Sequence, residues 1–469
     1  MTEKPKIPTI VVVLGATGDL TAQKITPALW NLYRGGSLPQ MFRVIGFARR
    51  PFPDRDFAKM AAANLLKRLR AAEAAEAEKF LGLFSYSQGF FERRADYLRL
   101  KKRLDEIDEG WGMCSNKLFY LAVPPRLYPD ILKNLASTGL SRPCGGPKEG
   151  WTRIIVEKPF GSDLQSAKDL DVLLGELFSE DQIYRIDHYL AKEMLQNILA
   201  FRFSNDLFEA SWNRSGISEI RVRLWESLGV EGRGGFYDGV GALRDVGQNH
   251  LLQMLALTAM VRPRSFSADD IRASRQAFLE SLAPLKPAEI RVGTVRGQYD
   301  GYRGIKGVAS DSETETYFRV EARSKDPNWR GVKFVIESGK RLGKSLKEIE
   351  VISRGEADRR NSLVFHIEPK EGIAIKFWAK KPGHGMELQE RKLGFNFRPA
   401  SQARPAEDYE KLLWDCLTDD QTLFVSSGEI QAMWRFIDPI IDGWHKGLSP
   451  LLRYKPDSAA VTRSNISSL

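Results

Sequence analysis

The sequence predicts an α/β domain built on a doubly wound parallel sheet, followed by an α+β domain with a large, mainly antiparallel sheet. In the first part of the chain, short apolar runs alternate with helical stretches, as they do in a doubly wound sheet. After about residue 187, strand-like runs follow one another with few helices between them, which is typical of an antiparallel sheet. We therefore expect one domain at residues 1–187 and a second at residues 188–469.

The elements of the first domain are predicted from short β-branched or aromatic runs that are separated by longer helical patterns. Clusters of proline and glycine mark the ends of several strands or the connections beyond them. We expect strands at residues 10–14, 42–48, 117–123, 153–156 and 182–186, and helices at residues 26–33, 57–80, 128–137 and 164–178.

The elements of the second domain are mostly strands. We expect them at residues 217–224, 314–322, 332–336, 349–353, 363–368 and 373–379. Helices at residues 243–258, 271–281 and 409–417 are expected to flank the resulting sheet.

The composition is that of a globular protein with a large buried core. The 469 residues are 42% hydrophobic and 28% charged, which excludes a chain too polar to fold. The cysteines, Cys114, Cys144 and Cys416, are odd in number and far apart, which argues against a disulfide framework or a thiolate metal site. Because we find neither a signal peptide nor an apolar run of about 18 residues, we expect a cytoplasmic protein without a membrane partner.

The net charge of +10 raises the question of an anionic partner. Basic clusters such as Arg49-Arg50 and Lys380-Lys381 are short and scattered, whereas nucleic-acid binding favours a concentration on one arm or helix. We therefore expect no nucleic-acid partner. A solvated basic surface and a set of pockets for small anions both stay open.

A glycine-rich segment directly after the first strand has the composition of a phosphate-binding turn. Gly15 and Gly18 allow the backbone to turn tightly and approach a pyrophosphate, while the following helix supplies free amides and a favourable dipole. The standard spacing would need glycine at Thr17 and Leu20, so an ordinary turn between strand and helix is the alternative. We interpret the first domain as Rossmann-like and dinucleotide-binding, with cofactor contacts at Gly15, Ala16, Thr17, Gly18, Asp19 and Leu20.

The end of the second strand carries Arg49 and Arg50, where NAD enzymes of this architecture often carry an acidic residue. A carboxylate would repel the 2′-phosphate of NADP, whereas guanidinium groups hydrogen-bond to phosphate and stack on adenine. We therefore expect NADP as the cofactor and NAD as a weaker alternative. A solvated strand end is the structural alternative for the two arginines.

Two of the five histidines lie in segments with several reactive side chains. His188 follows Asp187 at the expected end of a strand, and its neighbours Tyr189 and Lys192 could offer donors to a phosphate or sugar from about one helical turn. His250 lies in an expected helix whose other face is strongly apolar. A buried structural histidine is the alternative at that position.

Several segments occur in a fixed order along the chain: GATGDL at residues 15–20, LFYLAVPP at 118–125, EKPFG at 157–161, RIDHYLAKE at 185–193, EGRGGFYD at 231–238, RDV at 244–246, QNH at 248–250 and SGKRL at 338–342. Taken together they resemble the glucose-6-phosphate dehydrogenase family, and the resemblance runs nearly from end to end. The ordered set is far more specific than any one of its motifs.

The resemblance implies that the chain oxidises the C1 hydroxyl of glucose 6-phosphate to the lactone with hydride transfer to NADP, the first oxidative step of the pentose phosphate pathway. His250 matches the base that takes the hydroxyl proton, and Asp187 matches the carboxylate that orients its imidazole. His188, Tyr189 and Lys192 match the phosphate-binding group of the family.

Further positions acquire roles from the same resemblance. The resemblance implies that the sugar hydroxyls are contacted by Glu226, Asp245 and Lys340. It places Lys24 and Lys158 near the substrate and the nicotinamide, and it makes Pro124 and Lys158 cofactor contacts. It also implies that Pro159 follows a cis peptide bond. Each position has a structural alternative, such as a helix cap, a solvated charge or a local ion pair. Homodimers or homotetramers joined through the large sheet are also implied.

The sequence departs from the family pattern at two sugar-site positions. Ser345 stands where a second basic residue is expected, and a local shift would bring Lys344 to the substrate instead. Glu368 stands where the family has glutamine, which adds a negative charge that could weaken glucose 6-phosphate or favour an amino sugar. The alternatives are a related hexose-phosphate or amino-sugar-phosphate dehydrogenase with the same base, and a non-catalytic NADP-binding protein.

Overall fold

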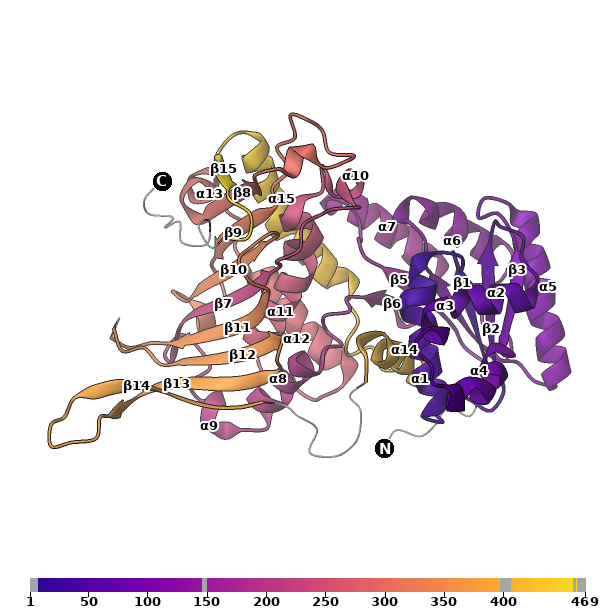
Figure 1. Cartoon of the computed structure of the whole chain (residues 1–469), viewed down its shortest axis with the longest axis horizontal. Helices are drawn as coiled ribbons and strands as arrows, with labels where there is room; N and C mark the ends of the chain where they lie inside the picture. Colours follow the sequence, from indigo (N-terminus) through magenta and orange to yellow (C-terminus); the bar gives the residue numbers. More distant parts are fainter. Residues whose placement is uncertain (1–6, 146–149, 357, 397–405, 459–460, 462–469) are drawn as a thin grey trace. The chain divides into compact units, whose positions relative to one another are not determined.

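A computed structural model describes residues 7–145, 150–356, 358–396, 406–458 and 461, and the chain divides into two compact units (Figure 1). The first unit comprises Met1–Gly161, Gln165–Ala191 and Ala406–Val425. The second unit comprises Ser162–Leu164, Lys192–Pro405 and Ser426–Leu469. None of the helices found in the described residues is long and apolar enough to cross a membrane.

The first unit is built on a six-stranded parallel sheet with the strand order β3-β2-β1-β4-β5-β6. Its strands are β1 (Thr9–Leu14), β2 (Phe42–Ala48), β3 (Phe84–Gln88), β4 (Asn116–Leu121), β5 (Thr152–Glu157) and β6 (Ile183–Ile186). Every residue of β1 and β4 is buried, as expected of strands covered on both faces. The predicted doubly wound α/β class is therefore confirmed.

The helices of the first unit alternate with these strands. They are η1 (Thr21–Ile25), α1 (Thr26–Arg34), α2 (Asp54–Ala61), α3 (Ala63–Leu66), η2 (Ala71–Glu73), α4 (Ala74–Leu81), α5 (Arg94–Trp111), η3 (Pro125–Leu127), α6 (Tyr128–Ser137), α7 (Leu164–Leu177), η4 (Glu180–Gln182) and α14 (Asp408–Thr418). The single helix predicted at residues 57–80 is wrong, because the segment forms α2, α3 and α4 with breaks between them. The many alanines favour a helical backbone along the whole segment. The buried side chains, however, lie in three separate short stretches, one in each of α2, α3 and α4, and no single helix buries them all.

The helix expected beside the antiparallel sheet at residues 409–417 is α14, and its expected place is wrong because it belongs to the first unit and contacts α1. The chain that follows α14 reaches the end of β6. There the Val425 N–H donates to the Arg185 carbonyl at 3.0 Å, and Phe424 forms an antiparallel bridge with Ile186. These contacts fix the strand end from which the predicted functional segment continues.

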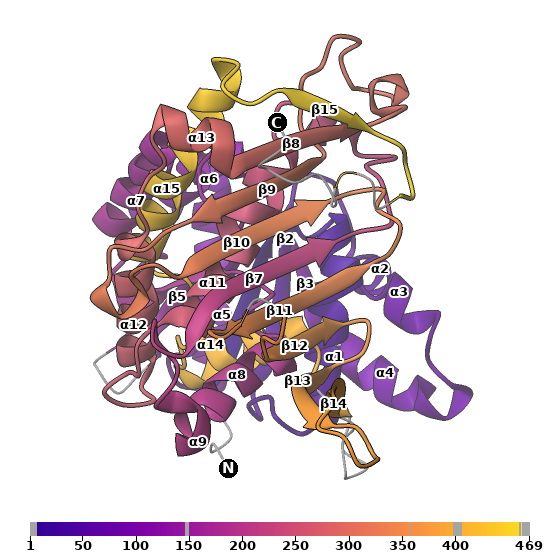
Figure 2. The same cartoon turned by 90° about the vertical axis from the view of Figure 1, so that its left-hand side faces the viewer.

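The second unit contains a nine-stranded sheet with the order β14-β13-β12-β11-β7-β10-β9-β8-β15 (Figure 2). Its strands are β7 (Ile217–Trp225), β8 (Thr294–Tyr299), β9 (Tyr317–Ala322), β10 (Lys333–Gly339), β11 (Leu346–Ser353), β12 (Ser362–Glu368), β13 (Gly372–Lys380), β14 (Leu388–Asn396) and β15 (Leu451–Tyr454). Only the pairs β7–β10 and β8–β15 are parallel. The prediction of a large, mainly antiparallel sheet is confirmed, although β8, β14 and β15 are additions to the predicted strands.

Helices of the second unit gather on one face of this sheet, as the two views of Figures 1 and 2 show for α8, α11, α12 and α15. Its helices are α8 (Glu193–Phe203), α9 (Asp206–Glu209), α10 (Gly234–Tyr237), η5 (Leu243–Leu251), α11 (Leu252–Ala259), α12 (Ala268–Ser281), α13 (Pro287–Gly293), η6 (Tyr302–Gly304), η7 (Pro327–Trp329) and α15 (Ser427–His445). The helix predicted at residues 243–258 exists, but its first nine residues form the π-helix η5. Helix α15, which packs against η5, is held to α12 by a fully buried ion pair between Arg275 Nε and Glu429 Oε1 at 2.9 Å.

Candidate functional site

The carboxyl ends of the parallel strands in the first unit bring several predicted site residues to one edge of the sheet. Leu14 is in register with Leu121, the last residues of β1 and β4, and Glu157 is in register with Ile186, the last residues of β5 and β6. Consequently the segments that begin at Gly15, Ala122, Lys158 and Asp187 all leave the sheet at this edge. Crevices at this edge are where open α/β sheets bind ligands.

The turn after β1 is closed so tightly that only glycine fits its first position. Gly15 has a φ of +88°, and a Cβ there would lie 2.3 Å from the Ala122 carbonyl oxygen. The Gly15 N–H donates to the Phe47 carbonyl at 2.8 Å, and the Gly18 N–H donates to the Gly15 carbonyl at 2.9 Å. Ala16 is buried, whereas Gly18 and Asp19 are exposed. The turn therefore leaves bare backbone at the surface, which fits the approach of a pyrophosphate.

Arg49 and Arg50 follow the end of β2 and are both exposed. Their backbone is held by β3, because the Gln88 side chain donates to the Arg49 carbonyl at 3.0 Å and the Tyr86 hydroxyl donates to the Arg50 carbonyl at 2.5 Å. Within the described part of the chain, neither guanidinium group forms a hydrogen bond or ion pair that would neutralise it. The two arginines are thus fixed through their backbone and keep their charges at the surface.

A carboxylate at the end of β5 organises a group of aromatic and basic side chains in the first unit. Glu157 accepts hydrogen bonds from the Tyr120 hydroxyl, at 2.5 Å, and from the Tyr409 hydroxyl. The burial of its carboxylate raises the pKa of Glu157, although both hydroxyls and the nearby Lys158 act in the opposite direction. The Lys158–Pro159 peptide bond that follows is cis, as predicted.

Tyr409, on α14, is a member of this group that sequence reasoning missed. Its ring stacks on the His188 ring with centroids 6.3 Å apart, and the Lys24 Nζ lies 5.8 Å from the Tyr409 ring centroid. One tyrosine therefore touches two predicted substrate residues as well as Glu157. Nothing local to residue 409 could have indicated this, because more than 200 residues separate it from the residues it contacts.

The segment after β6 is a turn, so the expectation that His188, Tyr189 and Lys192 share a helical turn is wrong. Helix α8 begins at Glu193, with Lys192 at its N-cap. Asp187 is almost fully buried, and its Oδ1 accepts the Tyr189 N–H at 3.0 Å. The His188 and Tyr189 rings lie 4.9 Å apart. A carboxylate that accepts a backbone N–H two residues later stabilises a turn in place of a helix.

In the second unit, the parallel pairing of β7 and β10 brings two predicted sugar contacts together. Trp225 and Gly339 are in register at the strand ends, and the next residues are Glu226 and Lys340. The Lys340 Nζ donates to Glu226 Oε2 at 2.6 Å. The Lys340 ammonium also lies 5.4 Å from the ring centroid of Tyr237, a cation–π distance.

The segment after Lys340 contains Ser345, one of the two positions at which the sequence departs from the family pattern. Ser345, at the position of the expected second basic residue, forms a hydrogen bond of 2.8 Å between its hydroxyl and that of Ser227. The Lys344 Nζ lies 5.5 Å from the Trp225 ring centroid. Lys344 is therefore near the end of β7, which is also where Glu226 begins the next segment.

Asp245 and His250 both belong to the π-helix η5. A π-helix has i→i+5 hydrogen bonds and more residues per turn than an α-helix. Residues five apart, such as Asp245 and His250, therefore project from more nearly the same side of η5 than they would from an α-helix. His250 is buried, with 3% of its surface exposed, while Asp245 is half-buried. Gly247 lets η5 approach the sheet, because a Cβ there would lie 2.7 Å from the Phe318 ring.

Glu368, at the end of β12, binds two lysines. Its Oε1 lies 2.7 Å from the Lys192 Nζ, and its Oε2 accepts a hydrogen bond from Lys347. Burial acts to raise the pKa of Glu368, but the two lysines outweigh it and lower that pKa below its ordinary value. The extra negative charge that the sequence indicated is therefore balanced, and Lys347 is the residue that sequence reasoning missed.

Two family models match this chain. The one described as "Glucose-6-phosphate dehydrogenase, NAD binding domain" matches residues 12–197, and "Glucose-6-phosphate dehydrogenase, C-terminal domain" matches residues 199–465. The chain belongs to the glucose-6-phosphate dehydrogenase family. The resemblance seen in the sequence motifs is thereby confirmed.

Individual members of the glucose-6-phosphate dehydrogenase family match over most of their length. The glucose-6-phosphate 1-dehydrogenase of Aggregatibacter actinomycetemcomitans is 39% identical over 449 residues, which are 92% of this chain and 90% of that protein. The glucose-6-phosphate 1-dehydrogenase 6, cytoplasmic, of Arabidopsis thaliana is 38% identical over 462 residues, 96% of this chain and 88% of that protein. A solved glucose-6-phosphate dehydrogenase in complex with its substrate glucose-6-phosphate has a TM-score of 0.90 and 34% identity, and the match covers 98% of this chain and 96% of that one.

The raised pKa of Glu157 predicts a pH-dependent effect of the Glu157→Gln variant. The folded state holds the carboxyl proton to higher pH than the unfolded chain, whose glutamate titrates near 4.5. As pH rises from the unfolded-state pKa of Glu157 to its higher folded-state pKa, the free energy of unfolding of the wild type falls relative to that of Glu157→Gln. The fall is about 1.4 kcal/mol per pH unit within this range.

Urea unfolding of both proteins at a series of pH values between 4 and 8 measures this difference. The control is Glu109→Gln, which makes the same change from carboxylate to amide at an exposed glutamate on α5. A pH-independent difference between wild type and Glu157→Gln would contradict the assignment.

Proposed function

We propose that this chain oxidises the C1 hydroxyl of glucose 6-phosphate to 6-phosphoglucono-lactone, with hydride transfer to NADP. The observation that carries the proposal is the match, over 98% of this chain, to a glucose-6-phosphate dehydrogenase solved with that substrate. The residues that match the family's base, phosphate and sugar contacts support it as well, apart from the two departures at Ser345 and Glu368. The reaction would be the first oxidative step of the pentose phosphate pathway.

The cofactor proposal rests on the carboxyl edge of the first unit. The turn at Gly15 has the bare backbone that a pyrophosphate needs, and a side chain there would clash with Ala122. Arg49 and Arg50 would bind the 2′-phosphate, and Pro124 and Lys158 would contact the nicotinamide half. NADP supplies the ring that accepts hydride from C1.

The acid–base proposal assigns one role to each of two buried groups. His250 takes the proton of the C1 hydroxyl as the hydride leaves, which requires a neutral imidazole beforehand. Asp187 orients that imidazole and favours its charged form once the proton has been transferred. Asp187 is suited to a fixed orientation because one of its oxygens already holds the Tyr189 N–H.

The substrate proposal assigns the sugar phosphate to cations that are held in place by neighbouring groups. His188, Tyr189 and Lys192 would bind the phosphate, and Glu226, Asp245 and Lys340 would bind the sugar hydroxyls, with Lys24, Lys158 and Lys344 nearby. The Lys340–Glu226 ion pair supports this assignment, since a paired ammonium and carboxylate can donate to and accept from adjacent hydroxyls. Positioning of this kind orients C1 for transfer.

The organisation of the chain belongs to the same proposal. We propose that residues 1–187 bind the dinucleotide and that residues 188–469 bind the substrate and associate into homodimers or homotetramers. A cytoplasmic location is supported by the name of the Arabidopsis thaliana relative, and by free cysteines throughout.

The base assignment predicts a large loss of turnover in His250→Asn. The asparagine retains a polar side chain but cannot accept a proton, so kcat falls by roughly 10² to 10⁴ while glucose 6-phosphate binding stays nearly intact. Steady-state kinetics and substrate titration measure the two quantities separately. The exposed His384 provides the matched control, because His384→Asn is expected to leave kcat unchanged. Unchanged turnover in His250→Asn would remove that residue from the role of base.

The cofactor assignment predicts that Arg49→Ala loses NADP affinity selectively. Removal of a charge-assisted hydrogen bond to the 2′-phosphate should raise the Kd of NADP by roughly tenfold and leave that of NAD nearly unchanged. Fluorescence titration with NADPH and NADH, which carry the same 2′ groups as NADP and NAD, tests this. Arg55→Ala, at an exposed position on α2, is the matched control. An equal loss for both cofactors would make Arg49 a structural arginine.

The contact between Glu368 and Lys192 predicts the sugar preference. Because both carboxylate oxygens of Glu368 are engaged by lysines, we expect glucose 6-phosphate to have a higher kcat/KM than glucosamine or galactose 6-phosphate. Glu368→Gln weakens the hold on Lys192 and should lower the KM for glucose 6-phosphate by several-fold. Steady-state rates with the three sugars test both statements, with Glu356→Gln at an exposed site as control. The highest kcat/KM with glucosamine 6-phosphate would make the amino-sugar alternative correct.

A further inference from the structure

A second concentration of basic residues lies in the second unit, outside every residue assigned above. It lines a cavity of about 690 Å³ between the β8–β15 end of the large sheet and the C-terminus of α15. The basic lining residues are Arg296, Arg303, His445, Lys446 and Arg453. We call this the β15 cavity. A smaller cavity of about 210 Å³ adjoins it and shares Arg296 and His445.

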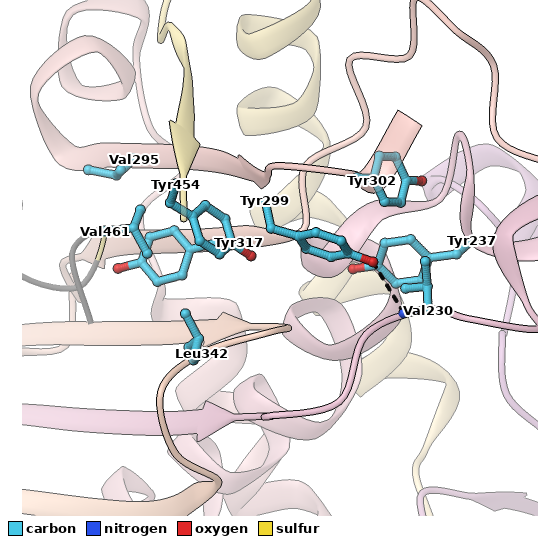
Figure 3. Packing of buried hydrophobic residues seen from close by; sticks show 9 residues of the cluster. All are labelled: Val230, Tyr237, Val295, Tyr299, Tyr302, Tyr317, Leu342, Tyr454 and Val461. Carbon is cyan, nitrogen blue, oxygen red and sulfur yellow. Dashed lines mark hydrogen bonds between the residues drawn. The ribbon is translucent and has the colours of Figure 1, made fainter. Parts of the chain in front are cut away.

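The register of β8 and β15 explains why the arginines gather on one face. The strands are parallel, with Arg453 opposite Gln298 and Tyr454 opposite Tyr299. Tyr299 and Tyr454 point into a buried cluster that also contains Tyr317 (Figure 3). Because side chains alternate along a strand, Arg453, next to Tyr454, and Arg296, three residues before Tyr299, point to the opposite face, where the cavity lies.

The arginines are held in place by their inner nitrogens or by a neighbouring side chain. The Arg296 Nε donates to the Ser449 carbonyl and the Arg303 Nε donates to the Ser312 carbonyl, each at 2.9 Å. The terminal nitrogens of Arg303 form no hydrogen bond to any residue that the structure describes. Arg453 donates one hydrogen bond through a terminal nitrogen, to Gln298. These hydrogen bonds already restrict the arginine side chains, so less conformational entropy is lost when a ligand binds.

The charge of the cavity is not balanced by its own lining. Glu313 is the acidic residue that lines it, and its carboxylate lies 3.6 Å from Arg296 with a side chain that is 70% exposed. The backbone carbonyls at the end of α15 do not neutralise these cations either, because they accept backbone hydrogen bonds. Asp442, Trp444 and Gly443 carbonyls accept the backbone N–H groups of the residues that follow the helix. Three arginines and a lysine therefore face one solvated carboxylate.

We propose that the β15 cavity binds a small molecule that bears a phosphate or diphosphate group. The planar guanidinium fork matches phosphate oxygens in pairs. Arg303, fixed through its Nε, presents both terminal nitrogens to a ligand, whereas Arg453 uses one terminal nitrogen on Gln298 and presents the other. The volume lies within the range of about 300 to 1,000 Å³ that is usual for small-molecule sites. Arg303 and Arg453 provide the main phosphate contacts. None of its lining residues is among the proposed sugar-phosphate and dinucleotide contacts, and the proposal does not depend on the proposed function.

Isothermal titration with inorganic pyrophosphate tests the proposal on the full-length protein. The titration is made in the presence and in the absence of glucose 6-phosphate and NADPH, which occupy the other proposed phosphate sites. We expect one saturable site while both ligands are present, and the same site together with binding at the other phosphate sites when they are absent. Arg303→Gln and Arg453→Gln should each weaken it by roughly tenfold, the worth of a charge-assisted hydrogen bond. Arg264→Gln, at an exposed position in the same unit, should bind as the wild type does.

Two results would overturn the proposal. One is the absence of saturable heat while glucose 6-phosphate and NADPH are present, and the other is equal affinity in the wild type and both cavity variants. Thermal unfolding of each variant checks that it is folded, and Arg453→Gln decides the outcome if Arg303→Gln is not. A parallel titration with inorganic phosphate shows whether one phosphate group is sufficient for binding. None of these readings requires turnover, so failure of the proposed reaction would leave them unaffected.

Discussion

The parallel register of β1, β4, β5 and β6 is the constraint on which the first unit depends. Hydrogen bonding of these strands in the same direction forces their carboxyl ends to one edge. The Gly15 turn, the Lys158–Pro159 peptide and Asp187 therefore meet there although they are far apart in sequence. The close contact between Gly15 and the Ala122 carbonyl leaves no room for any residue but glycine, so the bare backbone follows from strand pairing.

Two lysines of the second unit are held in position by carboxylates. Lys192 is held by Glu368, and Lys340 is held by Glu226, each across a short ion pair. The carboxylate orders each ammonium before a ligand binds, and at Lys192 the charge of Glu368 also competes with an anionic ligand. The surplus of positive charge along the chain is thus partly concentrated in places with defined geometry.

Features set by residues that lie close together in the chain could be predicted from the sequence, whereas contacts between distant segments could not. The buried run before Gly15, the arginines after β2 and the ordered family motifs are short-range signals, and they predicted the fold class and the candidate residues. Tyr409 and Lys347 were missed because their contacts with His188 and Glu368 are set by chain topology. The π-helix around His250 was also missed, since a hydrophobic pattern does not distinguish it from an α-helix.

Initial rates of nicotinamide reduction by the purified protein show whether it oxidises glucose 6-phosphate with NADP. The protein is mixed with glucose 6-phosphate and either NADP or NAD, and the absorbance of the reduced nicotinamide is followed. We expect reduction of both cofactors, with the higher kcat/KM for NADP because neither Arg49 nor Arg50 forms an ion pair with a carboxylate of the described residues. No reduction of either cofactor, by protein shown to be folded, would contradict it.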